Sequence, residues 1–183
     1  EFLRKMGREN SSHTFVITRG SFFRTFLLFN FVFGLLILLF TTKKGVVKRT
    51  AMGKYENIKS NGLIAIKLNS GDSLVWANKT TGKDHISLVS RDGKSIRFKE
   101  ADVRPTDRDT MGVRGILLKG TDYIISMESF SEEEPVAADK RTKVFRDLLT
   151  VTENGMGKRT PLKEYPVQNR SGQGLKVSET TDK

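Results

Sequence analysis

The sequence contains no cysteine and only two histidines, His13 and His85. The lack of cysteine excludes disulfides, thiolate zinc sites and cysteine nucleophiles, and it fits a reducing cytosol. Two histidines cannot build a histidine-based metal site. No glycine-rich phosphate-binding motif is present, so ATP is not expected to bind this chain directly. The acidic residues of the turns are too scattered to predict a carboxylate pair or a magnesium site.

Long apolar runs are also scarce, and the one candidate spans residues 26–40, where Asn30 is the only polar residue. The run is shorter than the roughly 20 residues that a membrane helix needs, and a membrane partner is not expected. The repeat described below uses Leu38–Phe40 as its first strand. We therefore predict that residues 1–37 form an apolar and basic leader. A leader of artefactual or truncated origin, a buried strand or helix, and a membrane segment stay open as interpretations.

The net charge of +11 is unevenly distributed. Residues 1–55 hold ten Lys and Arg against two acids, which leaves 22 basic and 19 acidic residues for the rest of the chain. The segment from Glu128 to Asp139 is acidic. Beyond the leader, any binding of anions must therefore come from local clusters of basic residues rather than from the bulk charge.

One pattern occurs three times, at residues 38–50, 88–98 and 149–160. Each copy is an apolar strand, a tight turn ending in glycine and a second strand with Lys or Arg. A second glycine follows the turn glycine after 17, 19 and 17 residues, at Gly62, Gly112 and Gly172. Self-similarity of this kind predicts a repeat architecture in which each unit buries its apolar face against its neighbours.

The segments between the turns alternate apolar and polar residues and are rich in Val, Ile, Thr and Phe, which favours strands. Many short, evenly spaced strands favour an all-β sandwich, barrel or propeller-like fold, and about four strands in each complete unit are typical of a propeller blade. We predict units at about 38–85, 86–147 and 148–177, the third one partial, and a polar tail at 178–183. The predicted strands are 46–50, 63–68, 73–77, 86–90, 95–99, 113–118 and 123–127.

Several segments resemble the C-terminal domain of the bacterial DNA gyrase A subunit, and the related topoisomerase IV A-type subunit ranks second. They are residues 40–50, 96–105, 110–116 and 154–160, the last followed by Glu164-Tyr165-Pro166. The resemblance implies a partial β-pinwheel, a propeller-like disc of four-stranded blades with two complete repeats and part of a third. It also implies a basic rim that binds duplex DNA and bends it around the disc.

The resemblance further implies that this chain is a non-catalytic fragment of an isomerase, a type II DNA topoisomerase. The complete enzyme of that family introduces negative supercoils and uses ATP and magnesium. No cofactor is expected in this chain, and Tyr55, Tyr123 and Tyr165 match no catalytic position. The implied partners are duplex DNA, the remaining domains of the gyrase A subunit and the ATPase B subunit. The implied location is the cytoplasm, in association with the nucleoid. The family's seven-residue box, Gln-Arg-Arg-Gly-Gly-Lys-Gly, has no intact copy, but the loop at 168–174 matches it at four of seven positions.

Basic residues recur at the same places in the repeats, and clustered charge favours an electrostatic footprint for a polyanion. Arginine can also hold a phosphate through two parallel hydrogen bonds. The alternative roles for these basic residues are a solvated hairpin surface and ion pairs with Glu100, Asp107 or Asp109. The alternative function for the chain is that of a propeller-like protein-interaction domain. The predicted DNA-binding residues are Lys43, Lys44, Lys48, Arg49, Arg91, Lys94, Arg97, Arg104, Arg108, Arg114, Lys158, Arg159 and Arg170.

Overall fold

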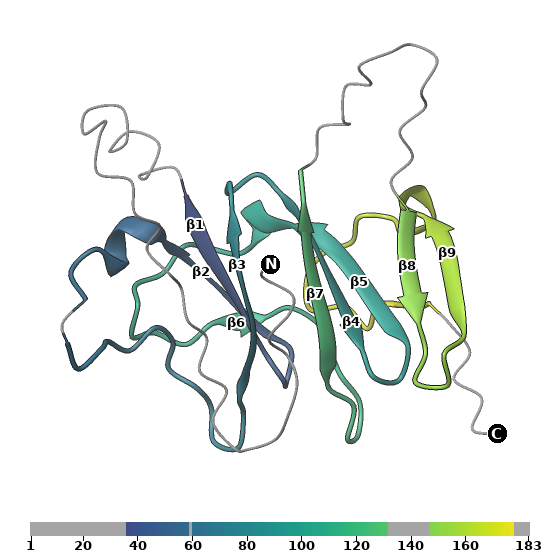
Figure 1. Cartoon of the computed structure of the whole chain (residues 1–183), viewed down its shortest axis with the longest axis horizontal. Helices are drawn as coiled ribbons and strands as arrows, with labels where there is room; N and C mark the ends of the chain where they lie inside the picture. The colour runs from purple at the N-terminus through teal and green to yellow at the C-terminus, as the bar shows by residue number, and fades with distance from the viewer. Residues whose placement is uncertain (1–35, 59, 132–146, 178–183) are drawn as a thin grey trace, which may run out of the picture.

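The computed structural model describes residues 36–58, 60–131 and 147–177, and this part of the chain is all-β. Three sheets stand side by side with their strands running in similar directions (Figure 1). The first sheet has four strands in the order β3-β1-β2-β6. Their bounds are β1 Ile37–Thr42, β2 Val46–Ala51, β3 Leu74–Thr80 and β6 Val113–Arg114. All neighbouring pairs in this sheet are antiparallel.

The second sheet also has four antiparallel strands, in the order β10-β5-β4-β7, and the third sheet has two, β8 and β9. Single 3-10 turns follow β2, β5 and β9. The sheets confirm the prediction of an all-β fold with four-stranded blades. The remaining bounds are β4 His85–Ser90, β5 Lys94–Lys99, β7 Ile124–Phe130, β8 Asp147–Val151, β9 Gly157–Pro161, β10 Leu175–Lys176, η1 Met52–Tyr55, η2 Glu100–Asp102 and η3 Leu162–Glu164.

The turn glycines of the three repeats close three equivalent hairpins. Gly45, Gly93 and Gly155 have φ angles of 79°, 72° and 78°, a region that only glycine enters without strain. The N–H of each glycine donates to a carbonyl three residues earlier, at 2.9–3.1 Å. The hairpins therefore share one register, which pairs Leu39 with Arg49 in the first and Leu149 with Arg159 in the third.

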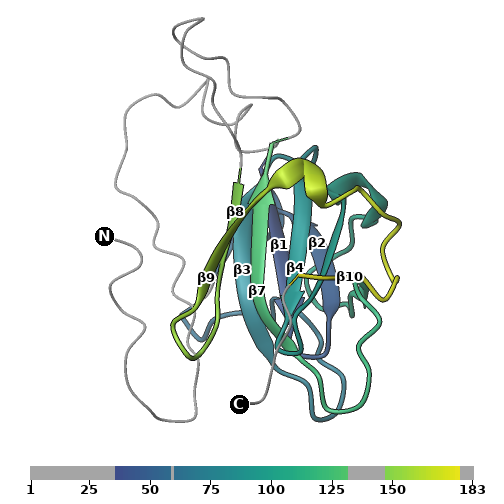
Figure 2. The ribbon, with the colours of Figure 1, turned by 90° about the vertical axis from the view of Figure 1, so that its right-hand side faces the viewer.

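The fourth strand of each complete sheet comes from the following repeat. β6 pairs with the start of β2, and β10 pairs with the start of β5. Figure 2 shows the chain leaving β9, crossing over the sheets and descending to β10. The prediction that one unit supplies all four strands of its blade is therefore wrong, and residues 63–68 are not a strand. A local hydrophobic pattern cannot reveal which of two neighbouring sheets an extended segment joins.

The core lies between the first and second sheets. Its buried residues include Leu39 and Val47 of the first sheet and Phe98 and Met127 of the second. Thr41, although polar, is fully buried here and its hydroxyl contacts the Met127 sulfur at 2.8 Å. Each fully buried large apolar side chain contributes on the order of 1.5–3 kcal/mol relative to exposure. This core fixes the two sheets against each other and so fixes the spacing of their hairpins.

Some predictions fall on residues outside the described ranges. These are the leader up to residue 35, most of the segment between the second and third units, at 132–146, and the tail at 178–183. Within the described ranges, no helix is long and apolar enough to span a membrane. β1 begins at Ile37 and contains Leu38–Phe40, which confirms that these residues form the first strand of the repeat.

Candidate nucleic-acid interface

The tips of the first and second hairpins meet around one aromatic ring. Lys43 Nζ lies 4.5 Å and the Arg91 guanidinium 5.2 Å from the centroid of the Tyr123 ring. Two backbone hydrogen bonds of 2.9 Å, from Ile124 N–H to Lys43 O and from Arg91 N–H to Tyr123 O, fix this arrangement. Each exposed cation–π contact contributes about 0.5–1 kcal/mol. The fold thus holds two cations from successive repeats at neighbouring positions of one edge.

Lys44 and Arg91 lie on the same edge and make only weak polar contacts. Lys44 Nζ donates to the Ser70 carbonyl at 3.0 Å, and Arg91 Nε pairs with Asp92 at 3.0 Å. The hydrogen bond and charge of Asp92 raise the pKa of Arg91, so this guanidinium keeps its charge. Because exposed ion pairs contribute about 0–1 kcal/mol, a phosphate can compete for these side chains.

Lys48 does not belong to this surface, and its prediction as a DNA contact is corrected. Its side chain is 1% exposed, and its ammonium donates to the Ala65 carbonyl at 2.8 Å and to the Arg108 carbonyl at 2.6 Å. Burial lowers the pKa of Lys48 to about 8, against the opposing effect of Asp109 and Asp107. Lys48 therefore holds two outer segments of the chain together beneath the surface.

Arg49 and Arg97 occupy equivalent places in β2 and β5 and are only half-exposed. Arg49 Nη1 donates to the Gly82 carbonyl at 3.3 Å. Arg97 Nη1 donates to the carbonyls of Leu162 and Tyr165 at 3.2 Å, and its guanidinium lies over Phe130 at 5.2 Å. Arg97 thus ties the third repeat to the second sheet. These contacts give a structural reason for an arginine at this position of the repeat, in addition to the predicted role in DNA binding.

The outer loops carry a second group of predicted residues. Arg104 and Arg114 are exposed and Arg108 is half-exposed, all on the segment that leads from η2 into β6. Thr106 N–H donates to the Arg49 carbonyl at 2.9 Å, which holds this segment along the outer side of β2. Arg104 and Arg108 therefore lie along the outer side of the first sheet, whereas Arg114 lies opposite Val46, next to the tip of the first hairpin.

The box-like loop at 168–174 is the equivalent segment of the third repeat. Arg170 Nε donates to the Asp102 carbonyl at 3.0 Å, and its Nη1 donates to the Arg114 carbonyl at 3.2 Å. Ser171 N–H donates to the Gly115 carbonyl at 2.7 Å, and Ser171 has a φ of 72°. A shallow pocket of about 440 Å³ is lined by Asp102, Asn169, Arg170 and Ser171. Arg170 thus fixes its own loop against the second repeat.

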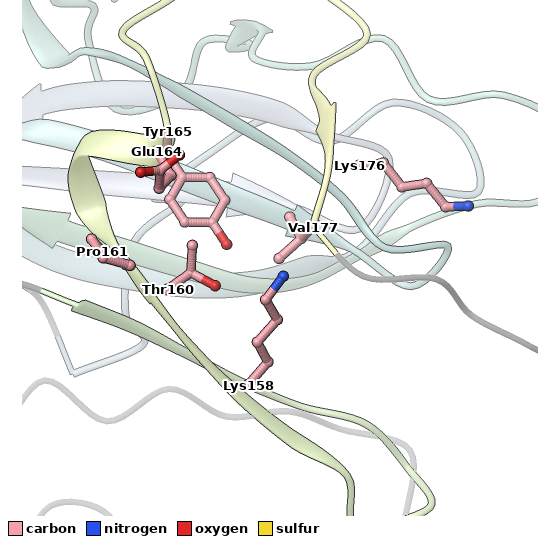
Figure 3. A pocket seen from close by; sticks show the side chains of 7 residues that line it. All are labelled: Lys158, Thr160, Pro161, Glu164, Tyr165, Lys176 and Val177. Carbon is pink, nitrogen blue, oxygen red and sulfur yellow. The ribbon is translucent and has the colours of Figure 1, made fainter.

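The third hairpin carries the remaining predicted residues, Lys158 and Arg159, which are both exposed. Arg159 Nε pairs with Asp147 at 2.9 Å. Lys158 lines a pocket of about 370 Å³ together with Lys176, and Figure 3 shows the Lys158 ammonium directed toward Val177, the residue that follows β10. The other lining residues are Thr160, Pro161, Glu164 and Tyr165.

Lys176 is a basic residue that the sequence analysis missed. In the register of β5 and β10 it lies directly opposite Lys94, so two lysines face each other across one strand pair. Like charges directly opposite each other on neighbouring strands are unfavourable. The sequence could have identified Lys176 from the repeat. Lys176 ends the tripeptide Gly-Leu-Lys, and Arg114 ends the corresponding tripeptide Gly-Val-Arg of the second repeat. Lys158 and Lys176 line the same pocket together with Glu164, and Figure 3 shows the Lys176 ammonium directed away from that of Lys158.

Comparison with known proteins supports the repeat architecture independently. Residues 37–81, 84–131 and 146–183 match the family model described as DNA gyrase C-terminal domain, beta-propeller. The DNA gyrase A protein of Deinococcus deserti is 40% identical over 147 residues, and that of Staphylococcus epidermidis is 37% identical over 146. These matches cover 79% and 80% of this chain but only 17% and 15% of the relatives. The chain thus spans about one-sixth of their length.

Two solved structures share the fold. The crystal structure of the C-terminal domain of DNA topoisomerase IV superposes with a TM-score of 0.68 at 26% identity, covering 78% of this chain and 41% of that one. The structure of the DNA gyrase A C-terminal domain gives a TM-score of 0.64 at 30% identity, covering 78% and 43%.

Repeated hairpins, four-stranded blades and strands exchanged between neighbours define a propeller-like repeat domain. Within that class, the three matched repeats show that the chain belongs to the DNA gyrase C-terminal domain family.

Proposed function

We propose that this chain is a DNA-binding and DNA-wrapping module of DNA gyrase A, without catalytic activity of its own. The observation that carries the proposal is the juxtaposition of Lys43 and Arg91 around Tyr123. It brings one basic residue from each of the first two repeats to the same edge, in a chain of the DNA gyrase C-terminal domain family. A duplex following that edge would meet a phosphate contact at each blade. Such contacts bind any sequence and bend the duplex when they follow a curved surface.

In the whole enzyme, this module would support ATP-dependent negative supercoiling. The remaining domains of the gyrase A subunit and the ATPase B subunit would be its protein partners. Its location would be the cytoplasm, in association with the nucleoid. ATP and magnesium would act in those other parts. The C-terminal domain of a topoisomerase IV A-type protein is the second candidate, favoured by the TM-score of 0.68 to such a domain.

The predicted basic residues fall into two groups with different roles. Side chains at the hairpin tips and on the exposed outer segments contact phosphate. Arg49, Arg97 and Arg170 hold the loops and repeats in place through the backbone carbonyls they bind. The proposed phosphate contacts are Lys43, Lys44, Arg91, Lys94, Arg104, Arg108, Arg114, Lys158, Arg159 and Lys176.

A salt series of duplex affinity tests the proposal. Binding that releases counterions loses affinity with salt at a logarithmic slope of about −0.9 for each neutralised phosphate. The double variant Lys43→Ala/Lys44→Ala should flatten the slope by about two phosphates. The matched control is Lys83→Ala/Lys99→Ala, which removes two exposed lysines at the opposite end of β4 and β5 and should leave the slope unchanged. Equal slopes for both variants, or no binding by the folded chain, would contradict the proposal.

A further inference from the structure

Two carboxylates stand beside the hairpin tips whose basic residues carry the proposed DNA contacts. Asp72 lies against the tip of the first hairpin and Asp122 against the tip of the second. A negative charge at this place repels the phosphates of a duplex and so opposes binding there. The contacts that the two carboxylates make with the tips give a physical reason for their position.

Asp72 joins two segments of the first repeat through one oxygen. Its Oδ1 accepts hydrogen bonds from the backbone N–H groups of Lys44, at 2.9 Å, and of Ser73, at 2.8 Å. Lys44 is the tip residue directly before the turn glycine, and Ser73 directly precedes β3. Lys43 N–H donates to the Ser73 carbonyl at 2.8 Å. Both basic residues of this tip are therefore bonded through their backbone to the turn that carries Asp72.

Asp122 makes the same contacts in the second repeat. Its Oδ1 accepts from the N–H groups of Asp92, at 3.0 Å, and of Tyr123, at 2.8 Å. Arg91 N–H donates to the Tyr123 carbonyl at 2.9 Å. Asp92 holds the place that Lys44 has in the first tip. Because tip residues of opposite charge make the same bond, the carboxylate binds the backbone of the tip and not its side chains.

Asp122 also fixes the aromatic ring between the two tips. Lys43 and Arg91 lie over the Tyr123 ring, and Asp122 binds the backbone N–H of that tyrosine. The N–H of Asp122 itself donates to the Lys119 carbonyl at 3.1 Å, which closes its own turn. One carboxylate thus holds both the second tip and the ring on which cations of two repeats rest.

The tips depend on such hydrogen bonds because their side chains are exposed. Lys43, Lys44, Arg91 and Asp92 all point to solvent and contribute little packing. Hydrogen bonds to a charged acceptor are roughly twice as strong as those between neutral groups. A tip that is held in place before a duplex arrives loses less conformational entropy on association.

We propose that Asp72 and Asp122 are positioning residues of the DNA surface, which strengthen DNA binding although their charge opposes it. Each carboxylate holds the backbone of its tip, so that the basic side chains reach phosphate from a fixed origin. This role rests on the proposed function, since it requires a duplex at the hairpin tips. It belongs to the acceptor oxygen and not to the negative charge, and substitution separates the two.

Two substitutions of Asp122 make this separation. Asp122→Asn removes the charge and keeps an acceptor oxygen, since asparagine caps backbone N–H groups about as well as aspartate, whereas Asp122→Ala removes both. At fixed salt, Asp122→Asn should bind a duplex as tightly as the wild type or up to about twofold more tightly, the effect of two exposed unit charges about 10 Å apart in water. Asp122→Ala should bind about fivefold more weakly, which corresponds to about 1 kcal/mol of lost hydrogen bonding.

The matched control is Glu128→Ala. It removes an exposed carboxylate from β7, the strand that follows Asp122, at a position opposite Ser87 and away from the tips. Its affinity for the duplex should not fall. Equal or tighter binding by Asp122→Ala, in a chain whose wild type binds DNA, would overturn this role and leave the proposed function intact. A folded wild type that binds no DNA would overturn both.

Amide hydrogen exchange tests the positioning without DNA. The N–H of Asp92 loses its acceptor in Asp122→Ala and should exchange about fivefold faster, but it should keep the wild-type rate in Asp122→Asn. The N–H of Leu88, in the buried part of β4, should keep its rate in both variants. Unchanged exchange of Asp92 in Asp122→Ala, or an equal acceleration at Leu88, would overturn the role, because the carboxylate would then not act on the tip.

Discussion

The tripeptide Lys-Arg-Thr occurs in the first hairpin at 48–50 and in the third at 158–160, and the two copies have opposite surroundings. Lys48 is 1% exposed and bonded to two backbone carbonyls, whereas Lys158 is exposed beside a surface pocket. Across the hairpin, Leu39 is 0% exposed and Leu149 is 66% exposed, although both are leucines opposite an arginine.

The difference lies in the neighbours of each hairpin. The first hairpin has β3 on one side, β6 on the other and the second sheet against its face. Among the described residues, the third hairpin forms a two-stranded sheet, and isolated pairs of strands are marginally stable. The same residues thus form a core in one repeat and a surface in another, because burial in a repeat protein comes from the adjacent units.

The largest expected contrast is in stability. Leu39→Ala should lower the free energy of unfolding by about 2–5 kcal/mol, since it leaves a cavity in the core between the two complete sheets. Leu149→Ala removes the same atoms from an exposed site and should change it by less than about 0.5 kcal/mol. Urea denaturation followed by circular dichroism measures both values. Similar losses for the two variants would mean that the third hairpin is as well packed as the first.

The two lysines should differ in their effect on the pH dependence of stability. Burial lowers the pKa of Lys48 to about 8 in the folded state, below the value of about 10.4 expected in the unfolded chain. The unfolded state therefore binds more protons in this window, so the Lys48 contribution to stability rises with pH between these values. It is fully present above about 10.4 and lost as the pH falls through about 8.

Lys48→Met should remove this rise, and Lys158→Met, at the same place in the exposed copy, should keep it. The measurement is the difference in unfolding free energy between wild type and each variant, at about pH 7.5 and about pH 10. A rise that persists in Lys48→Met would show that another group causes it.

A smaller contrast concerns the equivalent arginines of the second and third repeats. Arg97→Ala removes hydrogen bonds to the carbonyls of Leu162 and Tyr165 and should cost about 1–3 kcal/mol, chiefly by loosening the third repeat. Arg159→Ala removes only the pairing with Asp147 by a side chain that is 77% exposed, which contributes about 0–1 kcal/mol. Amide hydrogen exchange of η3 should accelerate in the first variant alone. Unchanged exchange in Arg97→Ala would contradict its role as a tie between repeats.

Much of the fold could be predicted from the sequence because its signals are local. Alternating apolar residues and turn glycines such as Gly45 and Gly93 determine hairpins within about twelve residues. The exchanged strands could not be predicted in the same way. Val113 and Leu175 belong to extended segments whose partners lie in the preceding repeat, and no local pattern specifies that partner.

The site was predicted less completely than the fold. Exposed hairpin tips such as Lys43 follow directly from the turn, but Lys48 carries the same local sequence as Lys158 and is buried by distant segments. Repetition also misled in part. Arg97 recurs at a repeat position where it binds backbone carbonyls, so a recurring basic residue can have a structural cause and is not by itself a sign of DNA contact.

The most direct test of the central claim measures whether the chain bends DNA as well as binding it. A duplex much shorter than the persistence length of about 150 bp is stiff, so its two ends approach only when a protein bends it. With donor and acceptor dyes at the ends, saturating amounts of this chain should raise the energy transfer, and the Lys43→Ala/Lys44→Ala variant should raise it less at equal occupancy. Saturation of the duplex with no change in energy transfer would contradict the assignment of this domain as a wrapping module.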